Sequence, residues 1–415
     1  MNFLIRILIY LTVYVGLFST AFFLLGFLER KKAANLKSRS YFVSVIVPAY
    51  NEEDSLEKTV ESVVNLDYPK DKLEILIVND GSKDNTHKIG KMLERKYKNV
   101  KIYSKENGGK ASALNYGLKF AEGELVVTFD ADSIVAPDAL NNMIPYFSDN
   151  KVMAVTPGMK VYKPRGIIQR IQAVEYNLGI FLRKAMSMFN GINVTPGPFS
   201  IYRKEFFDRH GGYDERSITE DMEMAMRIQS LNYKIQNSAS SLVYTIAPRK
   251  FYDLLKQRRR WYLGAIKTFI QYREVFSRKY GEFGAIGLPL ALFSVFSSII
   301  LTSYYVIQAI RDSINQINLY SIINFDILNT LSFKSYVYIL KFYEYFSNGL
   351  GFFAIILMFF TISMLFFLNR ALKSEEGAIS TFISYGLFIF LYGLLYSIWW
   401  AVAIMHYIMG RRIKW

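Results

Sequence analysis

The spacing of hydrophobic residues divides the chain into three kinds of segment. Phe3 to Leu28 is apolar with one charged residue, Arg6, and it is long enough to cross the roughly 30 Å hydrocarbon layer of a bilayer. From Tyr41 to about Pro248, short apolar runs alternate with polar helical stretches. Long apolar runs return from Phe283 onward. The pattern therefore predicts a membrane anchor, an α/β domain and a membrane-embedded C-terminal region.

The α/β segment contains short runs rich in β-branched residues, separated by helical stretches at the spacing of βαβ units. Such alternation predicts a mostly parallel sheet that is covered on both faces. The predicted strands are Val43 to Val47, Leu73 to Val78, Val100 to Tyr103, Leu125 to Phe129 and Val152 to Thr156, and the predicted helices include Ser55 to Asn65 and Thr86 to Lys96.

Three apolar runs in the C-terminal region predict further membrane spans: Phe283 to Ile310, Asn348 to Leu368 and Ile379 to Tyr407. A basic cluster follows the N-terminal span and, by the positive-inside tendency, puts the α/β domain in the cytoplasm. Its residues are Arg30, Lys31, Lys32, Lys37 and Arg39. Four spans would place the basic tail from Arg411 to Lys414 outside. Either the tendency fails here, or Ile317 to Phe346 hides a fifth crossing.

Two stretches have amphipathic helical spacing. Gly166 to Phe189 places apolar residues on one face, so it packs on the sheet or lies on the bilayer surface. Phe251 to Phe276 is similar and contains a dense basic cluster at Arg258, Arg259 and Arg260. We expect four regions: an anchor with a basic linker (1–40), the α/β domain (41–250), interfacial helices (251–282) and a transmembrane region with about three spans (283–415).

Composition narrows the function classes. The chain is 52% hydrophobic and has a net charge of +15, and its charges lie beside apolar runs. In the absence of a nucleic-acid-binding motif, this favours a membrane surface and a phosphorylated substrate over nucleic acid. The chain contains no cysteine, which excludes disulfides, thiolate zinc sites and a cysteine nucleophile. Its three histidines are too scattered to suggest a metal cluster.

Two carboxylates, Asp130 and Asp132, follow the predicted strand from Leu125 to Phe129. The carboxyl ends of strands in an open α/β sheet face the ligand crevice. Carboxylates there suit Mg²⁺ or Mn²⁺ carrying a substrate diphosphate, although Asp-x-Asp is also common in solvated loops.

Two more polar segments follow predicted strands. Asp80 ends the second strand, where it can accept hydrogen bonds from a base or ribose, or cap a turn. Gly108, Gly109 and Lys110 form a glycine turn leading into a helix. Backbone amides at such a helix start, together with the lysine, can hold phosphate or sugar oxygens, and a simple turn is the alternative.

Together these segments resemble a membrane-integrated, processive family 2 glycosyltransferase, the group that includes cellulose, hyaluronan, chitin and poly-N-acetylglucosamine synthases. The resemblance covers roughly Val43 to Gly264 and the flanking spans. It implies a GT-A-type nucleotide-sugar-binding domain. The matching segments, in the family's order, are Val47-Pro48-Ala49-Tyr50-Asn51-Glu52, Asn79-Asp80-Gly81-Ser82, Gly108-Gly109-Lys110, Asp130-Ala131-Asp132, Thr219-Glu220-Asp221 and Gln257-Arg258-Arg259-Arg260-Trp261.

The resemblance implies roles on the donor side. Asp80 is expected to contact the uracil of a UDP-sugar, and Asp130 the ribose or sugar phosphate. Asp132, with Asp130, is expected to bind a divalent ion, Mg²⁺ or Mn²⁺, that bridges the two phosphates. Arg260 is expected to lie near the diphosphate. The other expected donor-binding residues are Pro48, Tyr50, Glu52, Lys110, Gln257 and Arg258.

Other roles concern catalysis and the acceptor. Asp221, beside Glu220, is expected to be the general base that takes the proton of the acceptor hydroxyl, or else a helix-capping residue. Trp261 is expected beneath the acceptor sugar, although a basic amphipathic helix on anionic lipid is the alternative for its segment. The other expected acceptor-side residues are Thr219, Gly197, Pro198 and Phe199. This loop contains prolines, whereas the corresponding loop of the family is rich in glycine and alanine. The difference concerns which acceptor is bound more than which reaction is catalysed.

The sequence thus predicts a metal-dependent, inverting glycosyltransferase in the cell membrane with a cytoplasmic catalytic domain. It is expected to add glucose or N-acetylglucosamine from a UDP-sugar to a growing polysaccharide, processively and coupled to export. Membrane lipid is an expected partner, and an export partner or a second copy of the chain stays open. One alternative is the transfer of one sugar to ceramide or a polyprenyl phosphate. Another is a binding or export subunit without catalysis.

Overall fold

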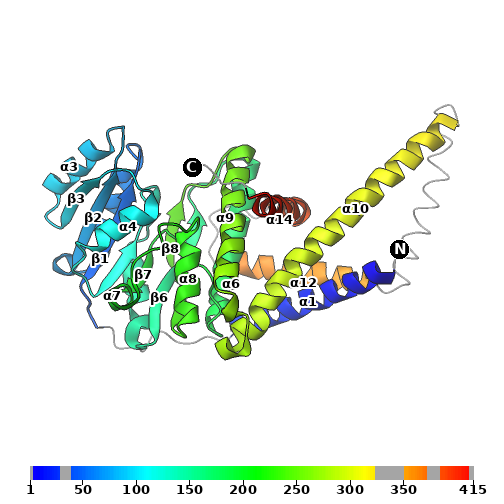
Figure 1. Cartoon of the computed structure of the whole chain (residues 1–415), viewed down its shortest axis with the longest axis horizontal. Coiled ribbons are helices and arrows are strands. Elements are labelled where there is room, and N and C mark those ends of the chain that lie inside the picture. Colours follow the sequence, from blue (N-terminus) through cyan, green and yellow to red (C-terminus); the bar gives the residue numbers. More distant parts are fainter. Residues whose placement is uncertain (1–2, 29–38, 323–349, 372–383, 411–415) are drawn as a thin grey trace.

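Within residues 3–28, 39–322, 350–371 and 384–410, which the computed structural model describes, the strands form one eight-stranded sheet in the order β3-β2-β1-β4-β7-β6-β8-β5. Figure 1 shows this sheet with helices packed beside it and apolar helices extending from one side. The strands are β1 (Val43–Ala49), β2 (Leu73–Asp80), β3 (Val100–Lys105), β4 (Leu125–Thr128), β5 (Ser133–Val135), β6 (Val152–Val161), β7 (Ser200–Arg203) and β8 (Lys234–Thr245).

The sheet is parallel over its first half and mixed beyond it. β1 lies between β2 and β4 and is parallel to both, and β3 is parallel to β2. β7 runs antiparallel to β4 and β6, β8 is parallel to β6, and β5 is antiparallel to β8. The α/β fold class is confirmed, and the prediction of a mostly parallel sheet describes β3 through β4 best.

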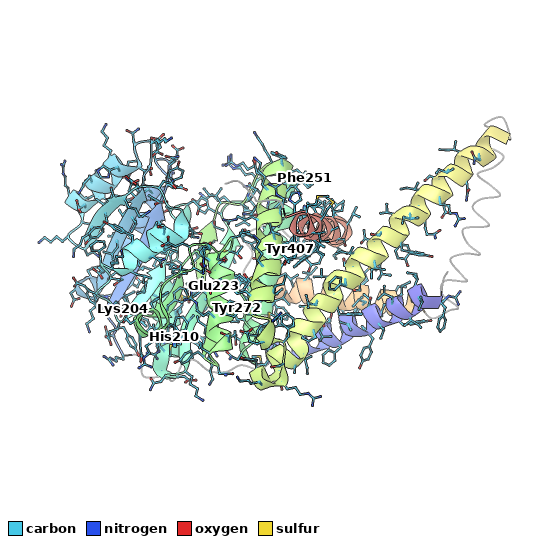
Figure 2. All side chains as sticks on the ribbon, in the orientation of Figure 1. Lys204, His210, Glu223, Phe251, Tyr272 and Tyr407 are labelled. Atoms are coloured by element: carbon cyan, nitrogen blue, oxygen red, sulfur yellow. The ribbon has the colours of Figure 1, made fainter. Side chains whose placement is uncertain are left out.

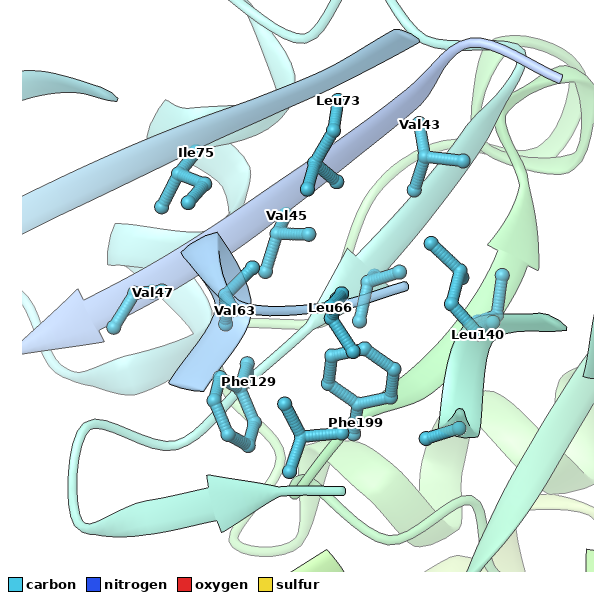
Figure 3. Close-up of a cluster of buried hydrophobic side chains, with 14 of the residues drawn as sticks. Val43, Val45, Val47, Val63, Leu66, Leu73, Ile75, Phe129, Leu140 and Phe199 are labelled. Carbon is cyan, nitrogen blue, oxygen red and sulfur yellow. The ribbon is translucent and has the colours of Figure 1, made fainter. Parts of the chain in front are cut away.

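Hydrophobic side chains on alternate strand positions form a core on each face of the sheet. Val43, Val45 and Val47 contribute to one core, whereas Ile46 contributes to the other. On the first face lie α2 (Leu56–Val64), α3 (Thr86–Lys96) and α5 (Ala139–Met143), and on the second lie α4 (Lys110–Leu118), α7 (Lys204–His210) and α8 (Glu220–Ser230). Figure 3 shows the first core.

Two long helices join the sheet to the apolar helices. α6 (Gly166–Ser187) packs beside the sheet. Gln169 Nε2 donates a hydrogen bond to the carbonyl of Ala247, and Tyr176 belongs to the same hydrophobic cluster as Ala247. α9 (Phe251–Gln271) contains the predicted Gln257 to Trp261 segment. Short helical turns occur at η2 (Lys70–Lys72), η3 (Ile144–Ser148), η4 (Arg273–Val275), η5 (Arg278–Tyr280), η6 (Phe283–Gly287) and η7 (Phe388–Tyr392).

The apolar helices are α1 (Phe3–Leu28), α10 (Leu288–Ile322), α12 (Leu350–Ala371) and α14 (Gly393–Ile408). Among the described residues, two helical segments, Phe3–Ala21 and Phe283–Asn315, are long and apolar enough to cross a bilayer, and Gly393–Ile408 is a shorter apolar helix. α12 and α14 overlap the third and fourth predicted spans. The possible crossing at Ile317 to Phe346, most of the basic linker and the basic tail lie outside the described residues.

Candidate functional site

The site forms where the carboxyl ends of parallel strands meet at one edge of the sheet. In the ladder between β1 and β2, Ala49 pairs with Asn79, which immediately precedes Asp80. In the ladder between β1 and β4, Ile46 pairs with Thr128, two residues before Asp130. Because these ladders fix the relative heights of the strand ends, the segments after β1, β2 and β4 converge, as expected for the crevice of an open α/β sheet.

Asp80 holds the glycine turn before α4. Its side chain is 2% exposed, and its Oδ1 accepts from Lys105 Nζ at 2.8 Å and from the backbone N–H of Gly108 at 3.0 Å. Oδ2 accepts from the Gly109 N–H at 2.8 Å. Gly109 has a φ of 86°, a conformation that favours glycine. The structure therefore gives Asp80 a role in shaping this turn, and its expected contact with a uracil stays a prediction.

Lys110, the first residue of α4, joins the two acidic groups of the site. Its Nζ lies 2.5 Å from Asp130 Oδ1 and 3.3 Å from Glu220 Oε1. Although burial opposes its charge, these carboxylates hold the pKa of Lys110 above its usual value. Lys110 is therefore charged at neutral pH and sits between the end of β4 and the start of α8.

Asp132 lies beside further carboxylates. Burial, followed by the charges of Asp130 and Glu52, raises its pKa to about 6. A divalent cation would relieve this repulsion, and two carboxylates suffice for Mg²⁺ or Mn²⁺ because the ion takes its other ligands from phosphates and water. The described residues contain no group of three or more acidic or histidine side chains arranged around one metal position. Asp130 and Asp132 thus fit a divalent ion that also binds a diphosphate. They do not fit an ion held by protein ligands alone.

Glu220 and Asp221 begin α8 directly after Thr219. Burial raises the pKa of Asp221 to about 6, with the Glu220 charge adding to the effect and Lys110 and Arg260 opposing it. Burial also disfavours the charge of Glu220, but Lys110 and Arg260 hold its pKa below the usual value. The arrangement gives one carboxylate that stays ionised and one that can exchange a proton near neutral pH, which is what general base catalysis requires.

The loop between α6 and β7 lies against both acidic groups. Thr195 donates to the backbone carbonyl of Asp221 through its hydroxyl at 2.8 Å and its N–H at 3.3 Å. A Cβ on Gly197 would collide with the Lys110 ammonium and lie 2.8 and 2.9 Å from the oxygens of Asp130. The structure thus brings Gly197, and the buried Pro198 beside it, to the site.

Phe199 does not lie with them. It is fully buried, and its ring packs edge-on against Phe129 with 5.2 Å between centroids. Both rings belong to the core in Figure 3. A φ of 61° at Phe199 turns the chain so that the ring fills the core below the loop, and the expected acceptor contact stays a prediction.

α9 contributes Gln257, Arg260 and Trp261. A Cβ on Gly264 would lie 2.9 Å from the Cβ of Thr219, so α9 closely approaches the start of α8. Arg260 is near enough for its charge to lower the pKa values of Glu220 and Asp221. Gln257 Oε1 is buried and has no hydrogen-bond partner among the described residues, which leaves an acceptor available to a ligand. Trp261 is partly exposed.

Arg258, one of the expected donor-binding residues, is buried between helices. Its side chain is 1% exposed, and its Nη2 donates to Glu175 Oε2 on α6 at 2.6 Å. Its guanidinium also contacts the rings of Trp261 and Trp399. In the run of arginines on α9, Arg258 points toward α6 and α14, because successive residues on a helix face different directions.

Of the three remaining donor-side candidates, Pro48 lies near the end of β1, and Tyr50 and Glu52 follow it. Tyr50 is 44% exposed, and Pro48 and Glu52 are partly buried. The N–H of Glu52 donates to the hydroxyl of Thr86 at 2.7 Å, and this bond ties the segment after β1 to the start of α3. Burial raises the pKa of Glu52, with the Asp130 charge contributing. Glu52 is therefore near enough to Asp130 for the two carboxylates to repel each other.

Comparison with known proteins agrees with this geometry. Residues 44–211 match the family model described as glycosyl transferase family 2. The chain is 31% identical over 275 residues to the poly-beta-1,6-N-acetyl-D-glucosamine synthase of Staphylococcus epidermidis, covering 65% of this chain and 66% of that protein. Residues 44–211 form a glycosyl transferase family 2 domain. It is also 32% identical over 237 residues to the synthase of the same name from Staphylococcus aureus, covering 57% of each. These matches span less than two thirds of either relative.

One solved structure resembles this chain over almost its whole length. The mannosyltransferase PcManGT from Pyrobaculum calidifontis, solved in complex with GDP-Man and Mn²⁺, has a TM-score of 0.64 and 18% identity, and the match covers 98% of this chain and 99% of that one. At this identity the likeness concerns the fold alone. It includes the apolar helices as well as the sheet, so the GT-A-like fold with flanking helices is confirmed.

Sequence reasoning did not single out Glu175 and Tyr176 of α6. Burial raises the pKa of Tyr176 to about 12, and the charges of Glu175 and Asp132 contribute, which places this ring near the carboxylates after β4. The available signal was a lone carboxylate in the amphipathic stretch from Gly166 to Phe189, next to an aromatic residue. The Glu175 side chain is only 20% exposed, and Arg258 supplies the cation that pairs with it.

Proposed function

We propose that this family 2 glycosyltransferase transfers N-acetylglucosamine from UDP-N-acetylglucosamine to the end of a growing polysaccharide at a membrane surface. The observation that carries the proposal is the position of Lys110, which contacts Asp130 on one side and Glu220 on the other. One lysine thus joins the carboxylates expected to hold the donor to those expected to activate the acceptor. The names of the two synthases from staphylococci support this sugar.

In the proposed reaction, the acceptor hydroxyl attacks the anomeric carbon of the sugar as the bond to UDP breaks, so the configuration inverts. Asp221 takes the hydroxyl proton, and Glu220 stays ionised beside it. Lys110 and Arg260 bind diphosphate oxygens, with Gln257, Pro48, Tyr50 and Glu52 around the donor. Asp132, with Asp130, would hold a Mg²⁺ or Mn²⁺ ion, whose charge offsets that of the departing UDP.

The acceptor side is formed by Trp261, Thr219, Gly197 and Pro198. An indole face suits the CH surface of a pyranose ring, which a sugar polymer presents repeatedly. The apolar helices adjoin α9, since Tyr262 stacks on Trp400 of α14 with 4.6 Å between ring centroids. We propose that the product grows by repeated addition and leaves beside these helices through the membrane.

The test uses the full chain purified in detergent with Mg²⁺ or Mn²⁺. UDP release is measured with UDP-N-acetylglucosamine and, in parallel, UDP-glucose, and radiolabelled product is separated on a gel. A long product sensitive to a β-N-acetylglucosaminidase, made from UDP-N-acetylglucosamine alone, would support the proposal. A single-sugar adduct that requires added lipid would replace it with the lipid glycosyltransferase, and no UDP release with any donor would favour a non-catalytic subunit.

Asp221→Asn provides the matched control for this assay. The amide has nearly the same shape as the carboxylate and cannot accept the proton, so we expect transfer to be lost while UDP binding survives. Turnover retained in this variant would contradict the role of Asp221. Asp132→Ala should lose activity and the response to added metal, and normal metal-dependent turnover would contradict its role as a ligand.

A further inference from the structure

Arg258 is buried at the meeting point of three helices. Its ion pair with Glu175 joins α9 to α6. Its Cζ lies 4.2 Å from the ring centroid of Trp261, three residues along α9, and 5.8 Å from that of Trp399 on α14. Trp399 is itself 1% exposed. The guanidinium therefore contacts the proposed acceptor-binding ring, a carboxylate of α6 and an apolar helix at once.

Burying a charge between helices costs desolvation free energy. Replacing a buried ion pair with hydrophobic residues of similar volume is often neutral or stabilising, so packing alone does not account for Arg258 and Glu175. A guanidinium differs from a hydrophobic side chain because its planar group stacks on an aromatic face while its N–H groups bind a carboxylate in a fixed direction. The pair therefore fixes an orientation.

The orientation that is fixed is that of Trp261. The indole also packs against a small cluster of Val161, Tyr176 and Ala247 at the edge of the sheet. Tyr176 lies near the Asp132 carboxylate, since the Asp132 charge contributes to raising its pKa. Trp261 is thus held between Arg258 and this cluster, and it stays partly exposed.

We propose that Arg258, oriented by Glu175, is a positioning residue that sets the angle of the Trp261 ring for the acceptor sugar. The proposal rests on the proposed function, in which the sugar chain lies on Trp261. Arg258 does not touch donor or acceptor. Its effect is therefore confined to acceptor binding and leaves donor binding unchanged.

The experiment compares Arg258→Met with the full-length wild type in detergent. UDP release from UDP-N-acetylglucosamine is measured with water as the only acceptor, and then with a short oligosaccharide of the β-1,6-linked sugar named in the staphylococcal relatives. Loss of the stacked guanidinium should raise the KM for the oligosaccharide about tenfold. The KM for UDP-N-acetylglucosamine should stay unchanged, which also shows that the variant is folded.

Three further variants distinguish positioning from packing. Arg258→Lys should behave like Arg258→Met, because an ammonium lacks the planar fork. Glu175→Gln should raise the oligosaccharide KM by less. The double variant Arg258→Met/Glu175→Gln should be no worse than Arg258→Met alone, since Glu175 acts through Arg258. Lys256→Met, on the exposed side of α9, is the matched control and should keep the wild-type KM values.

An oligosaccharide KM equal to wild type in Arg258→Met would overturn the inference. So would a parallel rise in both KM values, or fully additive effects in the double variant, because either result indicates general packing. If Arg258→Met does not fold, Arg258→Lys and Glu175→Gln decide by the same criterion. A wild-type protein that releases no UDP overturns the proposed function and this inference with it, whereas an active wild type with unchanged variants overturns the inference alone.

Discussion

Glu220 and Asp221 are adjacent in the chain, but their surroundings push their pKa values apart. Lys110 lies 3.3 Å from Glu220 and stabilises its ionised form, whereas burial and the charge of Glu220 raise the pKa of Asp221 to about 6. A base with a pKa just below the working pH is ionised and still accepts a proton readily. The two residues therefore have separate tasks, which the sequence Thr-Glu-Asp does not reveal.

This difference predicts the acid limb of the pH–rate profile. Because the base must be ionised, kcat should be constant near pH 7 and fall as the pH drops through the Asp221 pKa of about 6. Below it the loss should approach about tenfold per pH unit. UDP release from pH 5 to pH 8 at saturating donor and acceptor measures the limb.

The pKa of Asp132 is also raised to about 6, so the limb must be assigned. A bound divalent ion favours ionised Asp132 and should move its titration to lower pH, whereas Asp221 is not an expected ligand. A limb that stays in place as Mg²⁺ or Mn²⁺ is increased to saturation belongs to Asp221. A limb that moves steadily to lower pH with added metal would contradict that assignment.

Gly197 permits a close contact with Lys110 and Asp130, and Gly197→Ala tests it. The added Cβ would collide with the Lys110 ammonium and approach both Asp130 oxygens. Lys110 must then leave Asp130, so we expect kcat/KM for the donor to fall at least about tenfold through loss of electrostatic positioning. The matched control is Gly393→Ala in α14, where a Cβ has nothing within 4 Å and helical backbone tolerates alanine. Equal kcat/KM in both variants would contradict this role of Gly197.

At the scale of elements, contacts along its length hold α8 and thereby place Asp221. Near its start, Thr195 binds the Asp221 carbonyl, and Gly264 of α9 packs on Thr219. One turn further, the buried Glu223 pairs with Arg227 at 2.8 Å and accepts a hydrogen bond from the Tyr272 hydroxyl at 2.5 Å. Figure 2 labels Glu223 and Tyr272 where they meet. These contacts link the proposed base to the helices on the membrane side.

Tyr272→Phe should therefore destabilise the contact between α8 and the end of α9. Removing the hydroxyl leaves an oxygen of a 2%-exposed carboxylate without its donor, at a cost of about 2 kcal/mol. We expect Tm in detergent to fall by several degrees, on the order of 5 °C. Tyr252→Phe is the control, because Tyr252 is 64% exposed on the same helix and should leave Tm unchanged. Equal Tm values for the two variants would show that the Glu223–Tyr272 bond is not stabilising.

Elements with strong hydrophobic patterns could be predicted from the sequence, and those without could not. The five predicted strands correspond to β1, β2, β3, β4 and β6, because each presents a run of apolar residues to a core. β5 and β7 have three and four residues, too few to form a pattern. β8 contains three serines and one asparagine, and its buried polar side chains depend on partners from other segments, such as Thr156 for Asn237.

The same limit applies to the site. Residues that follow strands, such as Asp130 and Asp132, could be located because strand ends converge on one edge of the sheet. Arg258 and Phe199 could not, because side-chain direction depends on packing that the sequence does not contain. Arg258 has two arginine neighbours, and Phe199 belongs to a loop whose left-handed backbone turns its ring into the core.

At the scale of the whole molecule, the apolar helices leave large hydrophobic side chains uncovered. Phe3, Leu4 and Tyr14 of α1 are 73%, 69% and 68% exposed. α10 also exposes Ile307 and Ile317, at 63% and 61%. Apolar surface of this extent marks contact with a membrane or another protein. Together with the length of the two candidate spans, it indicates that the protein is membrane-associated.

The side on which the sheet lies can be tested because the chain contains no cysteine. Lys88 is exposed on α3, far in sequence from the proposed site residues of α8 and α9, so Lys88→Cys introduces one reactive thiol without disturbing catalysis. The basic cluster after Leu28 predicts that the α/β domain faces the cytoplasm. A membrane-impermeant maleimide should therefore label Lys88→Cys only after the cells are permeabilised. The unsubstituted chain should not be labelled at all, and labelling of Lys88→Cys in intact cells would place the domain, and its UDP-sugar site, on the outer face.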